Sequence, residues 1–123
     1  VRRNELGSDE YSFTVLRYKE GALVETTNAI GEDIPRVCTI QGEKGAINIP
    51  DFQNLTSFTL ETGSAHEEFS SPFLINGFEY EIESFREEAK KGRTHSSLFT
   101  PSHSINISTV IDSIVSYWRS EGL

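Results

Sequence analysis

Very short connections between β-type segments are the feature that most constrains how this chain can fold. Six segments between residues 10 and 69 are rich in β-branched and aromatic residues, and several of their connections are only a few residues long and contain glycine. Connections this short do not allow a parallel crossover, so consecutive strands must pair antiparallel. The predicted strands are residues 10–18, 22–30, 36–41, 46–49, 57–62 and 65–69.

Two helices are predicted in the last third of the chain. Asn76 is the predicted N-cap of the first helix, where Glu79 completes a capping box and Ile75 and Tyr80 are placed to form a hydrophobic staple. Gly92 is expected to end this helix. One apolar stripe runs along it, formed by Phe78, Ile82, Phe85 and Ala89.

The second predicted helix begins at Thr100-Pro101, because proline is favoured in the first turn of a helix. We expect Trp118 of this helix and Phe85 of the first to be core residues that join the helices to the sheet. The apolar stripe of the second helix consists of Ile107, Val110, Ile111, Ile114, Val115 and Trp118.

Strands first and helices last predict an α+β fold, namely a mainly antiparallel open β-sheet with two C-terminal helices packed on one face. The 123 residues suit a single domain, spanning residues 1–123. The first strand is apolar on both sides, with Tyr11, Phe13 and Val15 on one side and Leu16 and Tyr18 on the other. Helices can cover only one face, so the other sheet face is a predicted surface for homo-oligomer formation.

Charge and composition exclude several classes of partner. The net charge of −8 leaves no basic face for nucleic acid or for an anionic membrane surface. No apolar run approaches the roughly 20 residues of a membrane span. Cys38 is the one cysteine, which excludes an internal disulfide and predicts a reducing, cytoplasmic location. Because Cys38 lies in an apolar strand, it is interpreted as a small core residue.

The search for catalytic and binding motifs gives no site. There is no glycine-rich dinucleotide or phosphate motif, and the segment Gly42-Glu43-Lys44-Gly45 is better interpreted as a hairpin turn. The histidines, His66, His95 and His103, have no metal-ligand spacing, and the sequons at Asn54 and Asn106 are interpreted as chance matches. The glutamates crowded on the first predicted helix are interpreted as a solvated face: Glu79, Glu81, Glu83, Glu87 and Glu88. No catalytic, cofactor-binding or metal residue is therefore predicted.

Three blocks, in order, resemble the C-terminal domain of the glucose–fructose oxidoreductase / inositol dehydrogenase / MocA family. The first is Gly21-Ala22-Leu23 after an aromatic strand, and the second is the hairpin sequence of residues 40–50. The third is the tail, which starts with Asn76-Gly77-Phe78-Glu79 and continues through residues 96–101 to Ser104 near the start of the last helix. Together these blocks cover nearly the whole chain.

The resemblance implies an NAD(P)-dependent dehydrogenase acting on a sugar, polyol or related cyclic alcohol. In that family a preceding Rossmann domain binds NAD or NADP and carries a catalytic lysine in a Glu-Lys-Pro motif, which is absent here. No catalytic residue is carried over. The resemblance assigns this chain a wall of the small-molecule substrate site and, through its open sheet, a subunit interface.

The chain starts with Val1-Arg2-Arg3-Asn4-Glu5, without an initiator methionine, so we expect a fragment or a processed chain that lacks the N-terminal Rossmann domain and is inactive alone. Two alternatives stay open. One is a stand-alone α+β binding or dimerisation module without enzymatic activity. The other is a small acid–base enzyme with a cavity under a curved sheet, which requires a buried carboxylate or histidine on the concave face.

Overall fold

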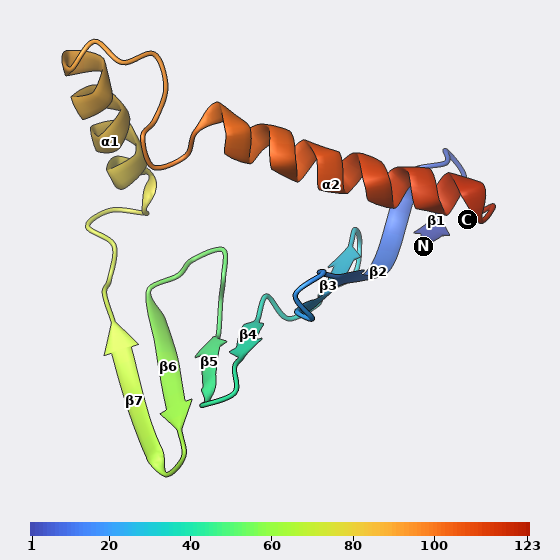
Figure 1. The fold of residues 1–123 in the computed structure, drawn as a ribbon, viewed down its shortest axis with the longest axis horizontal. Helices are drawn as coiled ribbons and strands as arrows, with labels where there is room; N and C mark the ends of the chain where they lie inside the picture. Colours follow the sequence, from blue (N-terminus) through green and yellow to red (C-terminus); the bar gives the residue numbers. More distant parts are fainter. The chain divides into compact units, whose positions relative to one another are not determined.

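The computed structural model describes residues 1–123. Every pair of neighbouring strands in it is antiparallel, as the short connections predicted. The structure is α+β, as predicted (Figure 1). Its elements are β1 (Arg2–Arg3), β2 (Asp9–Arg17), β3 (Leu23–Ala29), β4 (Cys38–Gln41), β5 (Ala46–Ile49), β6 (Ser57–Thr62), β7 (Ala65–Ser70), α1 (Phe78–Lys90) and α2 (Pro101–Ser120).

The chain divides into two compact units, each with one sheet and one helix. Unit 1 comprises Val1–Ile34 and Leu98–Leu123, and unit 2 comprises Pro35–Ser97. The sequence predicts one open sheet, whereas the structure has a three-stranded sheet, β1-β2-β3, and a four-stranded sheet, β4-β5-β6-β7. Residues 30–37 separate the two sheets. Pro35 in this segment has no amide to donate to a strand ladder.

The two C-terminal helices belong to different units, α2 to unit 1 and α1 to unit 2. In unit 1, α2 is grouped with the β1-β2-β3 sheet. The side of β2 that carries Ser12, Thr14 and Leu16 is the more buried side, and Ser12 retains only 3% of its exposure. The half-buried residues of α2 recur at helical spacing and match this side of the sheet: Val110, Ile114, Val115 and Trp118.

Unit 2 is built on two hairpins. The Gly42-Glu43-Lys44-Gly45 segment is the turn between β4 and β5, as predicted, and the Gly42 amide donates to the Gly45 carbonyl at 2.8 Å. Gly45 lies against the backbone of β6, where an added Cβ would overlap the Glu61 carbonyl oxygen. The second turn joins β6 to β7, and the Phe58 and Phe69 rings stack across this pair with centroids 4.7 Å apart.

The start of α1 is one residue later than predicted. Gly77, not Asn76, is the N-cap, with a left-handed φ of 96° that favours glycine. The predicted role of Glu79 in the capping box is confirmed. Its carboxylate accepts hydrogen bonds from the Ile75, Asn76 and Gly77 amides at 2.7–3.1 Å. The predicted staple is wrong, because Ile75 is exposed and the Tyr80 ring instead lies beside Phe73, with ring centroids 6.3 Å apart.

The start of α2 follows the prediction. Thr100 is the N-cap and Pro101 is the first helical residue. The capping box is completed by a histidine, since the Thr100 amide donates to His103 Nδ1 at 3.0 Å. Two residues of the predicted stripe, Ile107 and Ile111, are exposed.

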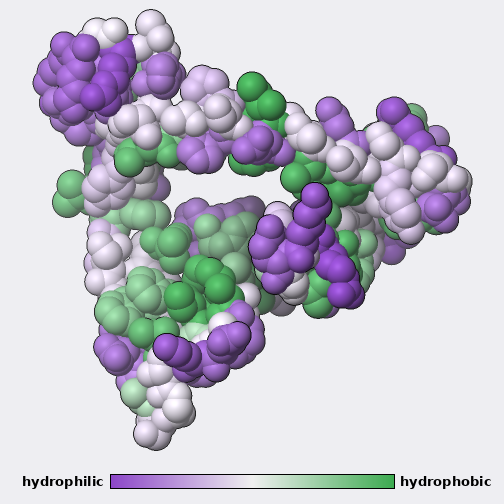
Figure 2. Space-filling view, viewed as in Figure 1, coloured by the Kyte–Doolittle hydropathy of each residue, from purple (hydrophilic) through white to green (hydrophobic).

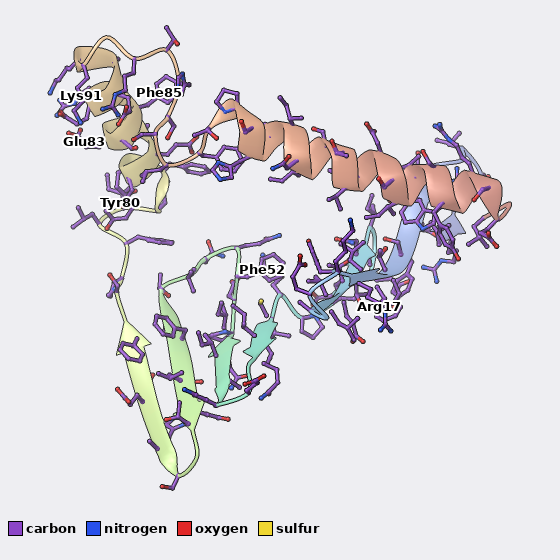
Figure 3. All side chains as sticks on the ribbon, viewed as in Figure 1. Arg17, Phe52, Tyr80, Glu83, Phe85 and Lys91 are labelled. Carbon is purple, nitrogen blue, oxygen red and sulfur yellow. The ribbon has the colours of Figure 1, made fainter.

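The prediction that Phe85 is a core residue is wrong. Its side chain is 61% exposed on α1, and Figure 3 shows it on the same helix as Glu83. Trp118 is half-buried in unit 1, so it is not enclosed in a core either. The periodicity of α1 gives it an apolar stripe, but nothing in unit 2 covers Phe78, Ile82 or Phe85.

Candidate interaction surfaces

One face of the four-stranded sheet is almost entirely apolar. Residues that lie opposite each other in antiparallel strands point to the same face, so the register assigns each side chain to one face. Figure 2 shows hydrophobic side chains gathered over this part of unit 2. We call this surface the apolar sheet face. Its apolar residues are Cys38, Ile40, Ile47, Ile49, Phe58, Leu60 and Phe69, and its one charged residue is Glu67.

The opposite face of the same sheet is polar. It carries hydroxyl, amide and carboxylate groups, and Thr39 donates to Asn48 Oδ1 at 3.0 Å across β4 and β5. His66 Nδ1 lies 3.7 Å from Glu61 Oε1 across the β6–β7 pair. A sheet with one polar and one apolar face is typical of a layer that is wet on one side and covered on the other.

The β2–β3 hairpin of unit 1 has a second uncovered surface. Its register runs from Tyr11 opposite Ala29 to Arg17 opposite Leu23, so the odd-numbered residues of β2 lie on the side away from Ser12. On this side Phe13 is 53% exposed and Val15 50% exposed. We call it the outward hairpin face, and it consists of Tyr11, Phe13, Val15, Arg17, Leu23, Glu25, Thr27 and Ala29.

The exposed area of the chain is larger than its mass accounts for. A compact 13.8 kDa protein exposes about 6,600 Å², and two separate compact proteins of half that mass expose about 8,000 Å² together. This chain exposes 10185 Å², and no hydrophobic side chain is fully buried. The exposed area exceeds even that of two fully separated compact proteins. The extra area therefore lies on the surfaces of the units themselves, whatever their relative placement. Many large hydrophobic side chains are among the exposed residues, and contiguous exposed apolar patches mark interaction sites.

The glutamates of α1 have structural roles. Glu83 pairs with Arg86 at 2.7 Å and Glu87 with Lys90 at 2.6 Å. These are exposed pairs one helical turn apart, as expected for a solvated helix face. The prediction of a solvated face thus describes Glu83 and Glu87, whereas Glu79 and Glu88 are held by hydrogen bonds.

Glu88 anchors the segment that follows α1. It is one of two buried polar side chains in the chain, the other being Ser12. Its carboxylate accepts hydrogen bonds from Ser97 Oγ at 2.9 Å and Arg93 Nη1 at 2.8 Å. The Ser97 hydroxyl and the Arg93 guanidinium together lower the pKa of Glu88 despite its burial. A carboxylate held in this way is bound as an anion and closes a loop rather than facing a cavity.

The start of α1 is closed to anionic ligands. Free backbone amides at a helix N-terminus bind phosphate, but here the Ile75, Asn76 and Gly77 amides already donate to Glu79. Partial burial opposes ionisation of Glu79, but these hydrogen bonds outweigh it and lower its pKa to about 2. The residues present therefore do not fit the pyrophosphate of a dinucleotide at this helix.

Acid should weaken α1 through Glu79. The folded-state pKa of about 2 lies below the ordinary value of 4.5, so the contribution of Glu79 is present above pH 4.5 and is lost between about pH 5 and pH 2. We expect Glu79→Gln to lower the thermal midpoint at pH 7 and to flatten this acid dependence. Circular dichroism at 222 nm during acid titration measures both effects. Glu81→Gln, in the same turn, is the control and should keep the wild-type profile.

The remaining candidate residues are scattered. His103 caps α2 and stacks on Phe99, with ring centroids 5.5 Å apart, and His95 belongs to the other unit. Cys38 is a half-buried free thiol in β4. No group of three or more histidine, cysteine, aspartate or glutamate side chains is arranged to hold a metal ion. The requirement of the acid–base alternative is not met, because the one buried carboxylate, Glu88, lies on a helix rather than on a sheet.

The asparagine of the first sequon is part of a local turn. The Gln53 and Asn54 amides and the Asn54 side chain all donate to Asp51 at 3.0–3.2 Å, and the Asn54 side-chain hydrogen bond is the main reason that the pKa of Asp51 is lowered. Asn106 of the second sequon is exposed within α2. Neither helix is long and apolar enough to cross a membrane.

Comparison of the sequence with family models and with curated proteins gives no match. The surfaces described above are therefore the basis for a functional proposal. Sequence reasoning missed two features of these surfaces, the near-complete segregation of apolar and polar side chains in the β4–β7 sheet and the placement of Arg17 and Glu25 on one face. Both features follow from the strand register. The positions of the hairpin turns in the sequence determine that register.

Proposed function

We propose that this chain is a non-catalytic assembly domain, the substrate-side half of an NAD(P)-dependent oxidoreductase that acts on a sugar, polyol or related cyclic alcohol. The observation that carries the proposal is the pair of uncovered apolar surfaces, the apolar sheet face and the outward hairpin face. One surface suits contact with the rest of the same protein, and the other suits contact between subunits.

The oxidoreductase class is supported by where the three resembling blocks lie. Gly21-Ala22-Leu23 joins β2 to β3, and residues 40–50 form the hairpin of β4 and β5. The segment Asn76-Gly77-Phe78-Glu79 opens α1. The first two blocks thus lie on hairpins, the element that the resemblance implies for them.

In this proposal the two halves of the enzyme have separate tasks. The nicotinamide cofactor supplies hydride transfer, and the preceding Rossmann half binds it. This chain contributes a wall of the substrate site and a subunit interface, and contributes no catalytic side chain. The single cysteine, half-buried and unpaired, favours a reducing compartment such as the cytoplasm.

Two measurements test the proposal. The sequence encoded upstream of Val1 should contain a strand, a glycine-rich turn and a helix, followed by a Glu-Lys-Pro motif. The 123-residue chain itself should show no binding of NAD or NADP by isothermal titration calorimetry, because its helix termini and its one glycine-rich turn are engaged within the chain. An upstream region without these elements would favour a stand-alone binding or dimerisation module. Micromolar cofactor binding by the chain would contradict the division of tasks.

A further inference from the structure

The outward hairpin face holds one positive and one negative side chain that have no ion-pair partner. Arg17 and Glu25 are both exposed and form no salt bridge in the chain. The third charge beside this face, Arg2, is different. It lies over the Tyr11 ring and is neutralised by Glu10 and Glu32.

We propose that two copies of the chain associate through the outward hairpin face, with Arg17 of each copy bound to Glu25 of the other. The proposal rests on the subunit interface of the proposed function and specifies its geometry. A two-fold symmetric contact uses the same surface on both copies, so one such pair implies a second. The two pairs would flank an apolar centre formed by Phe13 and Val15 of each copy.

The register determines how the charges meet. Arg17 lies opposite Leu23 in the last row of the hairpin, and Glu25 lies opposite Val15 in the row before. Consider a two-fold axis that is parallel to the strands and lies between the two stacked hairpins. It places β2 of one copy over β3 of the other, and each row of paired residues over the same row of the other copy. Glu25 of the other copy then lies above Val15, two residues along the strand from Arg17. Stacked sheets are about 10 Å apart, a gap that an arginine and a glutamate side chain can bridge together.

The other in-plane axis is disfavoured by charge. An axis perpendicular to the strands places Arg17 over Tyr11 of the other copy, next to Arg2, and leaves Glu25 over Thr27. Neither charge then meets an opposite one. Figure 3 shows Arg17 on the side of the hairpin away from α2, where a second copy has access to it. The apolar sheet face of unit 2 offers no such pair, because its one charged residue is Glu67 at the β7 edge.

The area of the face indicates a weak contact. The nine residues of β2 extend about 30 Å, and three strands span roughly 10–15 Å. This is a few hundred Å² per copy, below the ~800 Å² of a standard interface. We therefore expect a dissociation constant on the order of 10–100 µM at low salt, weakening as salt screens the two ion pairs.

Charge reversal with mixing tests the pairing. Arg17→Glu alone places two glutamates against two glutamates, and Glu25→Arg alone places two arginines against two arginines. By sedimentation equilibrium, each variant alone should associate about 10- to 100-fold more weakly than the wild type. An equimolar mixture should recover association close to the wild-type level, because each reversed copy then faces its complement. If Arg17 instead paired with Glu25 of its own chain, mixing the two variants would not restore the pair, so recovery on mixing is specific to pairing between copies.

Matched controls and outcomes separate the pairing from the proposed function. Lys44→Glu and Glu43→Arg make the same charge changes on the β4–β5 turn and should leave association unchanged. Circular dichroism of every variant should show an unchanged fold. If the wild type dimerises but the single reversals dimerise equally well, or the mixture stays monomeric, the Arg17–Glu25 pairing is wrong and the subunit interface lies elsewhere. If the wild type is monomeric up to about 100 µM, self-association itself is wrong.

Discussion

Gly45→Ala should destabilise unit 2 by on the order of 2–4 kcal/mol. Gly45 precedes β5, which pairs with β6, and its Cα approaches the β6 backbone closely. A methyl group there would overlap the carbonyl oxygen of Glu61 and lie 2.9 Å from Thr62 Cγ2. A backbone atom cannot rotate away as a flexible side chain can, so the β5–β6 ladder must shift to admit the alanine.

The neighbouring glycine provides the control. An alanine Cβ at Gly42 would meet only the Gly45 carbonyl oxygen at 3.5 Å, an ordinary contact. Gly42→Ala should therefore change stability by less than about 0.5 kcal/mol, or stabilise slightly by restricting the unfolded chain. Urea unfolding followed by circular dichroism measures both variants. Equal effects at Gly42 and Gly45 would contradict the close approach between the turn and β6.

Local signals predicted the elements of this chain well. The strands β5 and β6 have the predicted bounds, and the remaining predicted strands differ by a few residues. The reason is that turns, helix caps and alternation depend on residues within a few positions of one another. Thr100 and Pro101 specify the start of α2 without help from any distant contact. The error at Asn76 is of the same local kind, since Asn76 and Gly77 both suit an N-cap and the left-handed φ of Gly77 decides the position.

Long-range pairing was predicted less well. Periodicity shows that Phe78, Ile82 and Phe85 share a stripe, but not what covers the stripe. The same limit applies to the number of sheets, because antiparallel hairpins form locally whether or not β3 pairs with a later strand. The candidate surfaces depend both on local alternation along a strand and on long-range packing. Alternation predicted that Tyr11, Phe13 and Val15 share a side, whereas the burial of Ser12 was needed to show that this side is the uncovered one.

The carboxylates whose pKa values are shifted serve the local structure of this chain. A catalytic carboxylate or histidine needs a partly desolvated site to shift its pKa toward neutrality. In this chain the pKa shifts at Asp51, Glu79 and Glu88 all go downward, through hydrogen bonds that stabilise the ionised carboxylate. These groups stabilise turns and helix ends.

Trp118→Ala and Phe85→Ala should have unequal effects, although both residues lie on apolar helical stripes. Trp118 is half-buried in unit 1, so its truncation should lower the free energy of unfolding by about 2–3 kcal/mol, somewhat less than for a fully enclosed aromatic residue. Phe85 is 61% exposed, and its loss should change that free energy by less than about 1 kcal/mol.

Urea unfolding of the two variants, followed by circular dichroism because Trp118 is the one tryptophan, distinguishes the two roles. Trp118→Phe is the matched control and should retain most of the wild-type stability, since it keeps an aromatic ring at this half-buried position. A loss of 3–5 kcal/mol for Phe85→Ala, the range for a buried phenylalanine, would show that α1 is covered in solution. The apolar stripe of α1 would then be a core contact of unit 2, and the area left for partners would shrink to the two sheet faces.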